Sequence, residues 1–295
     1  MTLLLDTADS SRVWDTSAAR LGLPVQATSA ATPTTRASLP AFRPMRGLPS
    51  PSSGGGLVLV VPPQDQFDTL MARVTDGQLG WDWFADRIWT LDYPGQKLWL
   101  QSQGLPPSPA EAHDVQLGFA VDAGGRRIRQ VPRIGVEIDG ESWNMLFDTG
   151  ATAWINETAL QSVGDHGPAE RSWSLMWQTV IDGWRARHPD WRYVADADRV
   201  SHASMILVPV VRIAGFDVGP VWFGSLAHAI TNPPATPPDA PITQRQIVGT
   251  IGGNALSHFV IDLDYPAAVA RFSRATSGTS SMPRRRPSST STPDR

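Results

Sequence analysis

The chain has 295 residues, which is long enough for one large domain or two lobes with an ample core. Its net charge of −3 gives no reason to expect a nucleic-acid partner, and the absence of cysteine excludes disulfides and thiolate chemistry. No apolar run approaches the roughly 20 residues of a membrane-spanning helix, and 12 tryptophans with 26 prolines favour strands and loops over a helical bundle.

The first third of the chain predicts short strands separated by loops. Leu3 to Leu5 is typical of a short buried strand, and residues 16–24 combine an N-cap residue, a helical turn and Gly and Pro stops. Residues 24–56 are rich in Pro, Ser, Thr, Ala and Gly, so we expect a long, largely mobile loop with no clear hairpin. Further strands are expected at 57–61, 88–91 and 97–100, a short helix at 66–74, and the entry to a helical turn at 79–84.

The proline-rich residues 106–117 predict a linker between an N-terminal lobe (1–105) and a C-terminal lobe (118–274). Residues 275–295 are too polar to bury a core, so they predict a disordered tail. In the second lobe, apolar runs flank Asp139-Gly140, a strong hairpin signal that leads into Met145-Leu146-Phe147.

Two patterns further along the second lobe predict local structure. Trp173, Trp177 and Trp184 lie at i, i+4 and i+11, which indicates one face of a helix and part of the extra length of this lobe. Pro209 interrupts an apolar run at 205–213, and this predicts an edge strand.

Two stretches place an aspartate and a threonine directly after an apolar run. The first reads Leu3-Leu4-Leu5-Asp6-Thr7-Ala8 and the second reads Met145-Leu146-Phe147-Asp148-Thr149-Gly150. A glycine such as Gly150 lets the backbone turn sharply after the strand. An acid held at such a turn, beside its own backbone N–H groups, is placed to react.

The sequence around these two acids repeats. Thr16 aligns with Thr158 and Gly22 with Gly164, at the same offset of 142 that relates Asp6 to Asp148. A second block repeats at an offset of 172. It consists of Leu79-Gly80 with Leu91-Asp92-Tyr93-Pro94 in the first copy, and of Ile251-Gly252 with Leu263-Asp264-Tyr265-Pro266 in the second. Two blocks in the same order predict an internal duplication, with extra residues between the blocks of the second copy.

This combination resembles the aspartic peptidases, both pepsin-like and retropepsin-like, over most of residues 1–273. The resemblance implies an all-β, two-lobed acid-protease fold built from two related β-barrel-like halves with short helices. It makes Asp6 and Asp148 the catalytic pair. Thr7 and Thr149 would hydrogen-bond to the opposite backbone, Ala8 and Gly150 would complete the supporting loops, and Gly80 and Gly252 would pack behind them.

The chemistry that this resemblance implies requires no metal and no organic cofactor. Two carboxylates within about 3 Å share a proton, so one can activate a water while the other polarises the scissile carbonyl. The expected activity is that of an aspartic endopeptidase acting on a peptide or protein substrate, in a monomer with an intramolecular dyad. The six histidines show no metal-ligand spacing.

The first site departs from the family pattern, and this keeps other interpretations open. Ala8 stands where glycine is expected and Asp9 where a small neutral residue is expected, so the expected activity is lower than in a typical member. The alternative is a catalytically weak or inactive relative that binds extended peptides in the interlobe cleft. A third interpretation treats Asp6 and Asp148 as ordinary turn acids.

The start of the chain carries a further expectation. A strand pair precedes Asp148, whereas Met1 stands almost directly before the strand that carries Asp6. Either the native N-terminus is longer, or the first lobe lacks its outer hairpin and leaves an open sheet edge. The sequence leaves no room for a signal peptide, so the cytoplasm is the default location and export would follow from a longer N-terminus.

Overall fold

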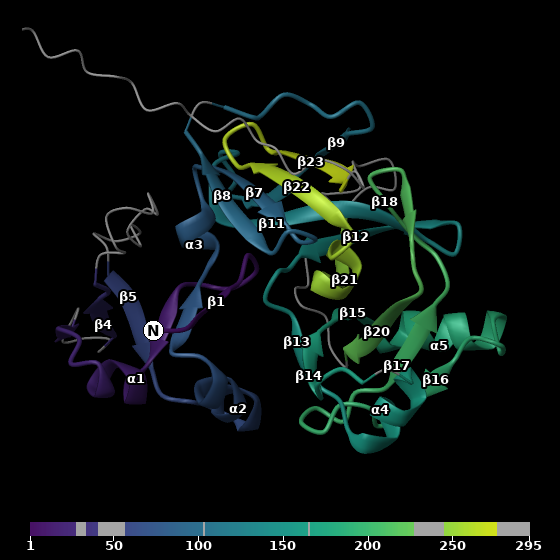
Figure 1. Ribbon diagram of the computed structural model, residues 1–295, viewed down its shortest axis with the longest axis horizontal. Helices are drawn as coiled ribbons and strands as arrows, with labels where there is room; N and C mark the ends of the chain where they lie inside the picture. The colour runs from purple at the N-terminus through teal and green to yellow at the C-terminus, as the bar shows by residue number, and fades with distance from the viewer. Residues whose placement is uncertain (28–33, 41–56, 103, 165, 227–244, 276–295) are drawn as a thin grey trace, which may run out of the picture.

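Strands and short helices build four sheets in the computed structural model, which describes residues 1–27, 34–40, 57–102, 104–164, 166–226 and 245–275. The predicted all-β character is confirmed. Figure 1 shows a sheet of the N-terminal half on the left, a larger sheet of the C-terminal half on the right, and a third sheet across the top. The described sheets are open, so the prediction of barrel-like halves is not matched by a closed barrel.

The N-terminal half contains β1 (Leu3–Leu5), β2 (Arg12–Trp14), α1 (Asp15–Arg20), β3 (Val25–Ala27), β4 (Thr35–Ser38), β5 (Leu57–Val61), α2 (Gln66–Val74), β6 (Gly77–Leu79), α3 (Trp81–Phe84), β7 (Ile88–Asp92) and β8 (Lys97–Gln101).

The remaining elements are β9 (His113–Gln116), β10 (Gly118–Val121), β11 (Arg127–Ile138), β12 (Glu141–Phe147), β13 (Thr152–Trp154), α4 (Glu157–Val163), β14 (Glu170–Ser172), β15 (Ser174–Trp177), α5 (Gln178–Arg187), β16 (Tyr193–Val194), β17 (Met205–Val208), β18 (Val211–Ile213), β19 (Phe216–Val218), β20 (Val221–Leu226), β21 (Ile247–Ile251), α6 (Gly253–Leu256), β22 (Phe259–Asp264) and β23 (Val269–Arg274).

The two halves repeat one sheet topology. The order β1-β6-β2-β5-β4-β3 in the N-terminal half recurs as β12-β21-β15-β20-β17-β16 in the C-terminal half. Strand directions recur as well: β1 runs parallel to β6 as β12 does to β21, and β2 runs parallel to β5 as β15 does to β20. The predicted internal duplication is therefore present in the topology of the sheets.

The registers of the two sheets match residue by residue at the aspartate strands. Leu5 pairs with Leu79, and Phe147 pairs with Ile251 at the equivalent place. The next backbone N–H then extends each ladder: Asp6 N donates to Leu79 O at 2.9 Å, and Asp148 N donates to Ile251 O at 3.0 Å. The backbone of each aspartate is thus hydrogen-bonded to the neighbouring strand at the equivalent place, and its loop begins there.

A sheet of five strands joins the halves, in the order β8-β7-β22-β23-β9. In its centre Thr90 lies opposite Asp262, which is its own repeat partner 172 residues later. When equivalent positions pair with each other, a two-fold axis passes between them. This local axis relates the hairpin β7–β8 to the hairpin β22–β23.

The structure corrects the alignment of the repeats beyond the aspartates. Helix α1 follows β2, and its topological counterpart is α5, which follows β15; both helices begin after a tryptophan that ends the preceding strand, Trp14 and Trp177. The true counterpart of Ser11-x-x-Trp14-x-Thr16 is therefore residues 174–179, which also read Ser-x-x-Trp-x-Thr. The match of Thr16 and Gly22 to Thr158 and Gly164 aligned α1 with α4, a helix inserted before β15.

The prediction of a helical tryptophan face is wrong for the same region. Trp177 ends strand β15, Trp173 directly precedes it, and only Trp184 lies on a helix. Residues 174–187 are the counterpart of β2 and α1, so they are not extra length. Much of the extra length is instead β13, α4 and β14, which lie between Asp148 and β15.

Three smaller predictions are also corrected. Residues 25–27 and 35–38 form the antiparallel pair β3–β4, although no hairpin was expected there; residues 28–33 and 41–56 lie outside the described residues. The predicted linker contains β9, which pairs with β23. Strand β17 ends before Pro209 and lies between β16 and β20, so it is not an edge strand. The predicted tail lies outside the described residues from 276 onward.

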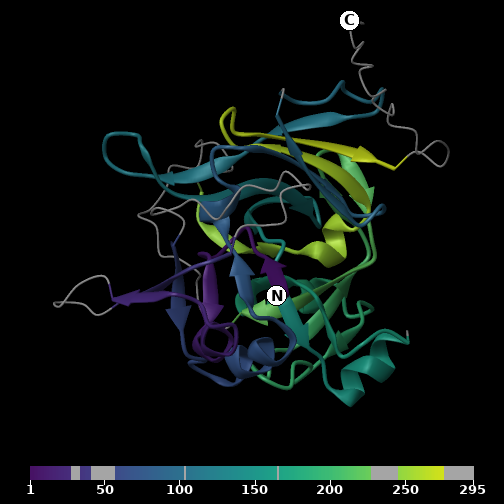
Figure 2. The same cartoon turned by 60° about the vertical axis from the view of Figure 1, so that its left-hand side comes forward.

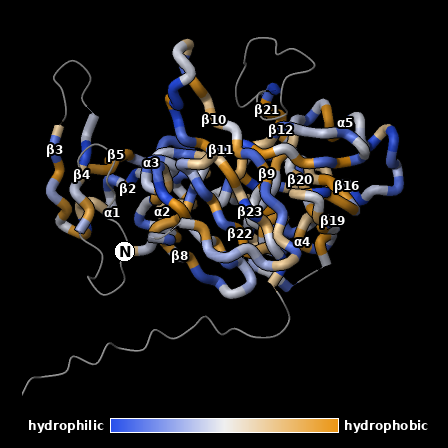
Figure 3. The backbone as a smooth tube through the Cα atoms, turned by 90° about the horizontal axis from the view of Figure 1, so that it is seen from above, coloured by the Kyte–Doolittle hydropathy of each residue, from blue (hydrophilic) through white to orange (hydrophobic). Residues whose placement is uncertain are grey.

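The core follows from alternation along the strands, which is visible in the hydropathy colouring of Figure 3. On β11, Ile134, Val136 and Ile138 are fully buried, whereas Glu137 between them is exposed. A separate small cluster of Trp14, Met71 and Trp154 packs α2 of the N-terminal half against the C-terminal half. No helix within the described residues is long and apolar enough to cross a membrane.

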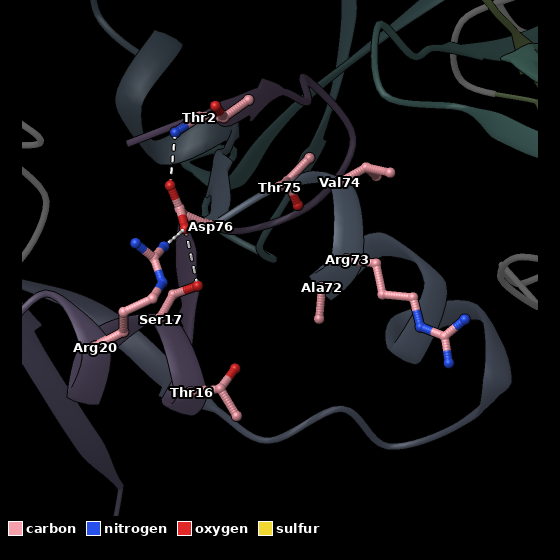
Figure 4. Close-up of a pocket in the computed structure, with 9 residues that line it drawn as sticks. All are labelled: Thr2, Thr16, Ser17, Arg20, Ala72, Arg73, Val74, Thr75 and Asp76. Atoms are coloured by element: carbon pink, nitrogen blue, oxygen red, sulfur yellow. Dashed lines mark hydrogen bonds and ion pairs between the residues drawn. The ribbon is translucent and has the colours of Figure 1, made fainter.

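A buried acid holds the start of β1 within the N-terminal half. Asp76 accepts hydrogen bonds from Thr2 N at 2.7 Å and Ser17 Oγ at 3.0 Å, and it pairs with Arg20 beside a cavity of about 400 Å³ (Figure 4). Burial alone would raise the pKa of Asp76, but these bonds and the charge of Arg20 hold it below its usual value. Figure 2 brings this half forward and shows it in front of the C-terminal sheet.

Candidate active site

The loops that follow β1 and β12 approach each other beneath the five-stranded sheet (Figure 1). Their threonines interlock: Thr7 Oγ1 donates to Phe147 O at 2.6 Å, and Thr149 Oγ1 donates to Leu5 O at 2.7 Å. In return, Thr7 N donates to Thr149 Oγ1 at 3.2 Å and Thr149 N donates to Thr7 Oγ1 at 3.1 Å. These four bonds tie the two aspartate loops together with the same two-fold relation as the sheets.

Each aspartate is held by the backbone of its own loop. Asp6 Oδ1 accepts from Ala8 N at 2.9 Å and from Asp9 N at 3.1 Å, and Asp148 Oδ1 accepts from Gly150 N at 2.9 Å. Because strands that are themselves paired carry both loops, the two side chains start from fixed backbone positions.

Glycine at position 150 is explained by the approach of Asp6. A Cβ built on Gly150 would lie 2.4 Å from Cγ of Asp6, far inside an ordinary contact, so the Asp6 carboxyl rests against the Gly150 backbone. This places the side chain of one aspartate directly on the loop of the other.

Ala8 occupies the equivalent position without backbone strain. It is not among the residues with positive φ, so the alanine side chain adds no left-handed backbone strain here. The bonds around the two loops are of nearly equal length, so the methyl group of Ala8 does not disturb the interlock.

Burial shifts both carboxyl groups towards the protonated form, and the charge of Asp6 adds to the shift of Asp148. Asp6 is 9% exposed, and burial raises its pKa despite the two backbone hydrogen bonds. Burial, followed by the charge of Asp6, raises the pKa of Asp148 to about 8, although this side chain is partly exposed. The pair therefore favours a singly ionised state in which Asp148 keeps the proton.

Two further charges act on this pair. The carboxylate of Asp9 raises the pKa of both aspartates. Arg12 forms an ion pair with Asp9 at 3.0 Å and lowers the pKa of Asp6. Because Arg12 acts on Asp6, it favours ionisation of Asp6 before Asp148.

Two serines that the sequence interpretation missed hold the segments behind the loops. Ser11 Oγ accepts from Gly80 N at 2.8 Å, and Ser174 Oγ accepts from Gly252 N at 3.0 Å. A Cβ on Gly80 would lie 2.2 Å from Asp9 O, and one on Gly252 would lie 1.7 Å from Trp173 O, which agrees with the packing role predicted for both glycines. The repeated Ser-x-x-Trp-x-Thr pattern was the signal that could have revealed these serines.

Two tyrosines lie close enough to the aspartate pair for its charge to raise the pKa of their hydroxyl groups. Tyr93 and Tyr265 are equivalent residues of the repeats, and the hydroxyl group of each is buried with no hydrogen-bond partner within the described residues. Burial raises the pKa of both phenols; Asp148 raises that of Tyr93 further, and Asp6 raises that of Tyr265. The sequence marked these residues as part of a repeat but assigned them no role.

A groove of about 740 Å³ lies between the halves, beside the loop that carries Asp148. The ring of Phe67 on α2 meets Trp154 on β13 edge-on at 5.2 Å between centroids, which links the halves at this place. Residues from both halves line the groove: Asp65, Gln66, Phe67, Thr152, Ala153, Trp173, Leu175, Gln178, Asp198, Val200, Ser201, His202, Ala203, Ser225 and Leu226.

Within the described residues, no three His, Asp or Glu side chains are grouped so that they could hold a metal ion. No protein-family model matches this chain, and no curated protein sequence matches it.

Proposed function

We propose that this chain is an aspartic endopeptidase with a two-lobed acid-protease fold, in which Asp6 and Asp148 activate a water between them. The observation that carries the proposal is the reciprocal interlock of Thr7 and Thr149, which brings two equivalent aspartate loops together. Two acids with raised pKa values on rigid strands are suited to acid–base chemistry.

In the proposed reaction, ionised Asp6 removes a proton from the water as its oxygen attacks the carbonyl carbon of the substrate. Protonated Asp148 donates its proton to the carbonyl oxygen, giving a neutral tetrahedral diol. The C–N bond then breaks as the amide nitrogen takes a proton from Asp6 and Asp148 recovers its proton from the diol. The products are a carboxylic acid and an amine, and the pair returns to its singly ionised state.

The proposal needs no cofactor, because the two carboxyl groups supply both the base and the acid. It also needs only one copy of the chain, because each half contributes one aspartate. The substrate would be an extended peptide or protein segment lying between the halves.

The test is substitution of each aspartate by asparagine, which keeps size and shape but removes the titratable group. Asp6→Asn and Asp148→Asn should each lower hydrolysis of an unstructured protein by about 1,000-fold or more, with Asp15→Asn, on α1 and outside the site, as a control that retains activity. The products would be followed by mass spectrometry at pH values from acidic to neutral. Turnover that persists in both asparagine variants would overturn the proposal.

A peptide-binding protein without turnover is the second candidate, and the carboxylate of Asp9 beside the pair favours it. That charge disfavours the ionised form on which hydrolysis depends. If the native chain binds extended peptides and releases no products at any pH, the second candidate replaces the first.

A further inference from the structure

Tyr93 and Tyr265 hold equivalent places in the sheet that joins the halves, directly after β7 and β22. Tyr93 N donates to Phe259 O of the second half at 3.3 Å, and Tyr265 N donates to Arg87 O of the first half at 3.2 Å. The two acceptors are related by the same offset of 172 as the two tyrosines. Each tyrosine is thus fixed by the half that carries the other one.

This crossed arrangement brings the ring of Tyr93 behind the loop of Asp148. The place that a Cβ on Gly253 would take lies 3.6 Å from Cε1 of Tyr93, and the place of a Cβ on Gly252 lies 3.4 Å from Cβ of Ala151. The backbone of these two glycines therefore lies against the ring and against the Asp148 loop. Tyr265, which is fully buried, stands in the equivalent relation to the first half.

The hydroxyl groups of both tyrosines are buried, and neither has a hydrogen-bond partner within the described residues. Most buried polar groups in proteins are paired, so two equivalent exceptions require a physical reason. A phenol without a fixed partner is free to turn its O–H bond. Inside a protein, where the dielectric constant is low, the dipole of that bond acts more strongly than in water. Each hydroxyl can therefore follow the charge of a nearby acid.

The phenols also remain protonated. Burial is the main cause of the raised pKa of each phenol; the charge of Asp148 adds to it at Tyr93, and the charge of Asp6 adds to it at Tyr265. Both hydroxyl groups are therefore donors over the whole range in which a carboxyl pair titrates. The same charge effects agree with the crossed placement, because each phenol faces the aspartate of the other half.

The other charged side chains close to the two tyrosines are bonded to backbone groups. Asp92 and Asp264 accept from N–H groups of their own turns, at 2.7 and 2.8 Å. Arg87 and Arg127 donate to backbone carbonyl groups. The charges that change during the proposed reaction are those of the two aspartates.

We propose that Tyr93 and Tyr265 are positioning residues of the aspartate pair, and that each turns its hydroxyl dipole towards the carboxylate of the other half while that carboxylate is charged. The inference rests on the proposed function, because it describes how the same site handles charge. In the proposed reaction Asp6 gains a proton as Asp148 loses one, so the negative charge moves from Asp6 to Asp148. Tyr265 stabilises the charge before this transfer, and Tyr93 stabilises it afterwards.

The pH–rate profile tests the two tyrosines separately. A dipole directed at a carboxylate favours the ionised form, so removal of the hydroxyl raises the pKa of the aspartate that it faces. Tyr265→Phe should move the acidic limb, which follows ionisation of Asp6, to higher pH by about 0.5 unit, and Tyr93→Phe should move the basic limb, which follows Asp148, by about the same amount. Limbs that stay in place in both variants would overturn the inference.

The plateau of the profile gives a second difference. Tyr93→Phe should lower the plateau rate about threefold, because the charge on Asp148 develops in the transition state. Tyr265→Phe should not lower it, because that hydroxyl stabilises the charge of the ground state. The control is Tyr193→Phe, the third tyrosine of the chain, which lies on the outermost strand β16 with the guanidinium of Arg185 over its ring at 3.7 Å. This variant should keep both limbs and the plateau of the parent.

Carboxyl titration by NMR, in protein with isotope-labelled aspartate, separates this inference from the proposed function. The variants Asp6→Asn and Asp148→Asn assign the two resonances. If the native chain hydrolyses nothing but Tyr265→Phe raises the pKa of Asp6 and Tyr93→Phe that of Asp148, the peptidase proposal fails and the role of the tyrosines stands. If hydrolysis occurs and neither the titrations nor the limbs move, the role of the tyrosines fails and the peptidase stands.

Discussion

Gly150→Ala tests whether the two aspartate loops are in contact as described. The added Cβ would start 2.4 Å from Cγ and 2.6 Å from Oδ2 of Asp6. Because ordinary carbon contacts begin near 3.5 Å, the carboxyl and the loop must separate by about 1 Å. Overpacking of this size costs about 1–3 kcal/mol of unfolding free energy. A displacement of about 1 Å at the reacting groups lowers a rate by roughly 100-fold.

The assay combines urea unfolding with initial rates on an unstructured protein. The control is Gly183→Ala on α5, where the nearest atom to a new Cβ is Arg187 Nη1 at 3.4 Å. Alanine is favoured over glycine inside a helix by about 0.5–1 kcal/mol, so this variant should be slightly more stable and fully active. A Gly150→Ala variant with the stability and the rate of the parent would show that Asp6 does not lie on this loop.

Asp9→Asn should lower the pKa of Asp6 and Asp148, and so move the whole pH–rate profile to lower pH; a profile that stays in place would show that Arg12 already neutralises Asp9. Because the native state keeps a proton on Asp148 up to about pH 8 while the unfolded chain loses it near pH 4, unfolding free energy should fall as pH rises between these values. Asp148→Asn should remove up to about 1.4 kcal/mol per pH unit of that slope, as urea titrations would show; an unchanged slope would contradict the raised pKa. Finally, β1 has one neighbouring strand and β12 has two within the described residues, so amide exchange should be faster at residues 3–5 than at residues 145–147, and equal protection would contradict this.

The sequence was sufficient for the parts of the site that lie at strand ends. Asp6 and Asp148 each follow an apolar run, and the resemblance to aspartic peptidases placed Gly80 and Gly252, from the second block of the repeat, behind the loops. These features are local, and both copies keep them at a constant spacing. They could therefore be predicted without knowing which strands pair.

The features that were missed depend on distant pairing. Ser174 is separated from Asp148 by an inserted strand, helix and strand, so the offset that related the aspartates no longer applied and α4 was matched to α1 instead. Trp173 and Trp177 have a spacing that fits a helix, but it also fits one face of a strand, since both numbers are odd. Only the pairing of β15 with β20 and β21 decides between the two.

The pairing of Thr90 with Asp262 on the local two-fold axis bears on why the two halves belong to one chain. In an assembly of two identical chains, a residue on the axis meets its own copy, so an aspartate there would face an aspartate at the distance of a strand pair, which is unfavourable. Fusion of the halves removes this restriction: Thr90 donates to Asp262, and a single buried acid is accommodated where a symmetric dimer would hold two or none. The two aspartate loops differ in the same way. Ala8 stands at the position equivalent to Gly150, and Asp9 stands at the position equivalent to Ala151. A covalent link between the halves thus permits the two carboxyl groups to differ in charge environment, and in the proposed reaction this difference divides the tasks of base and acid between them.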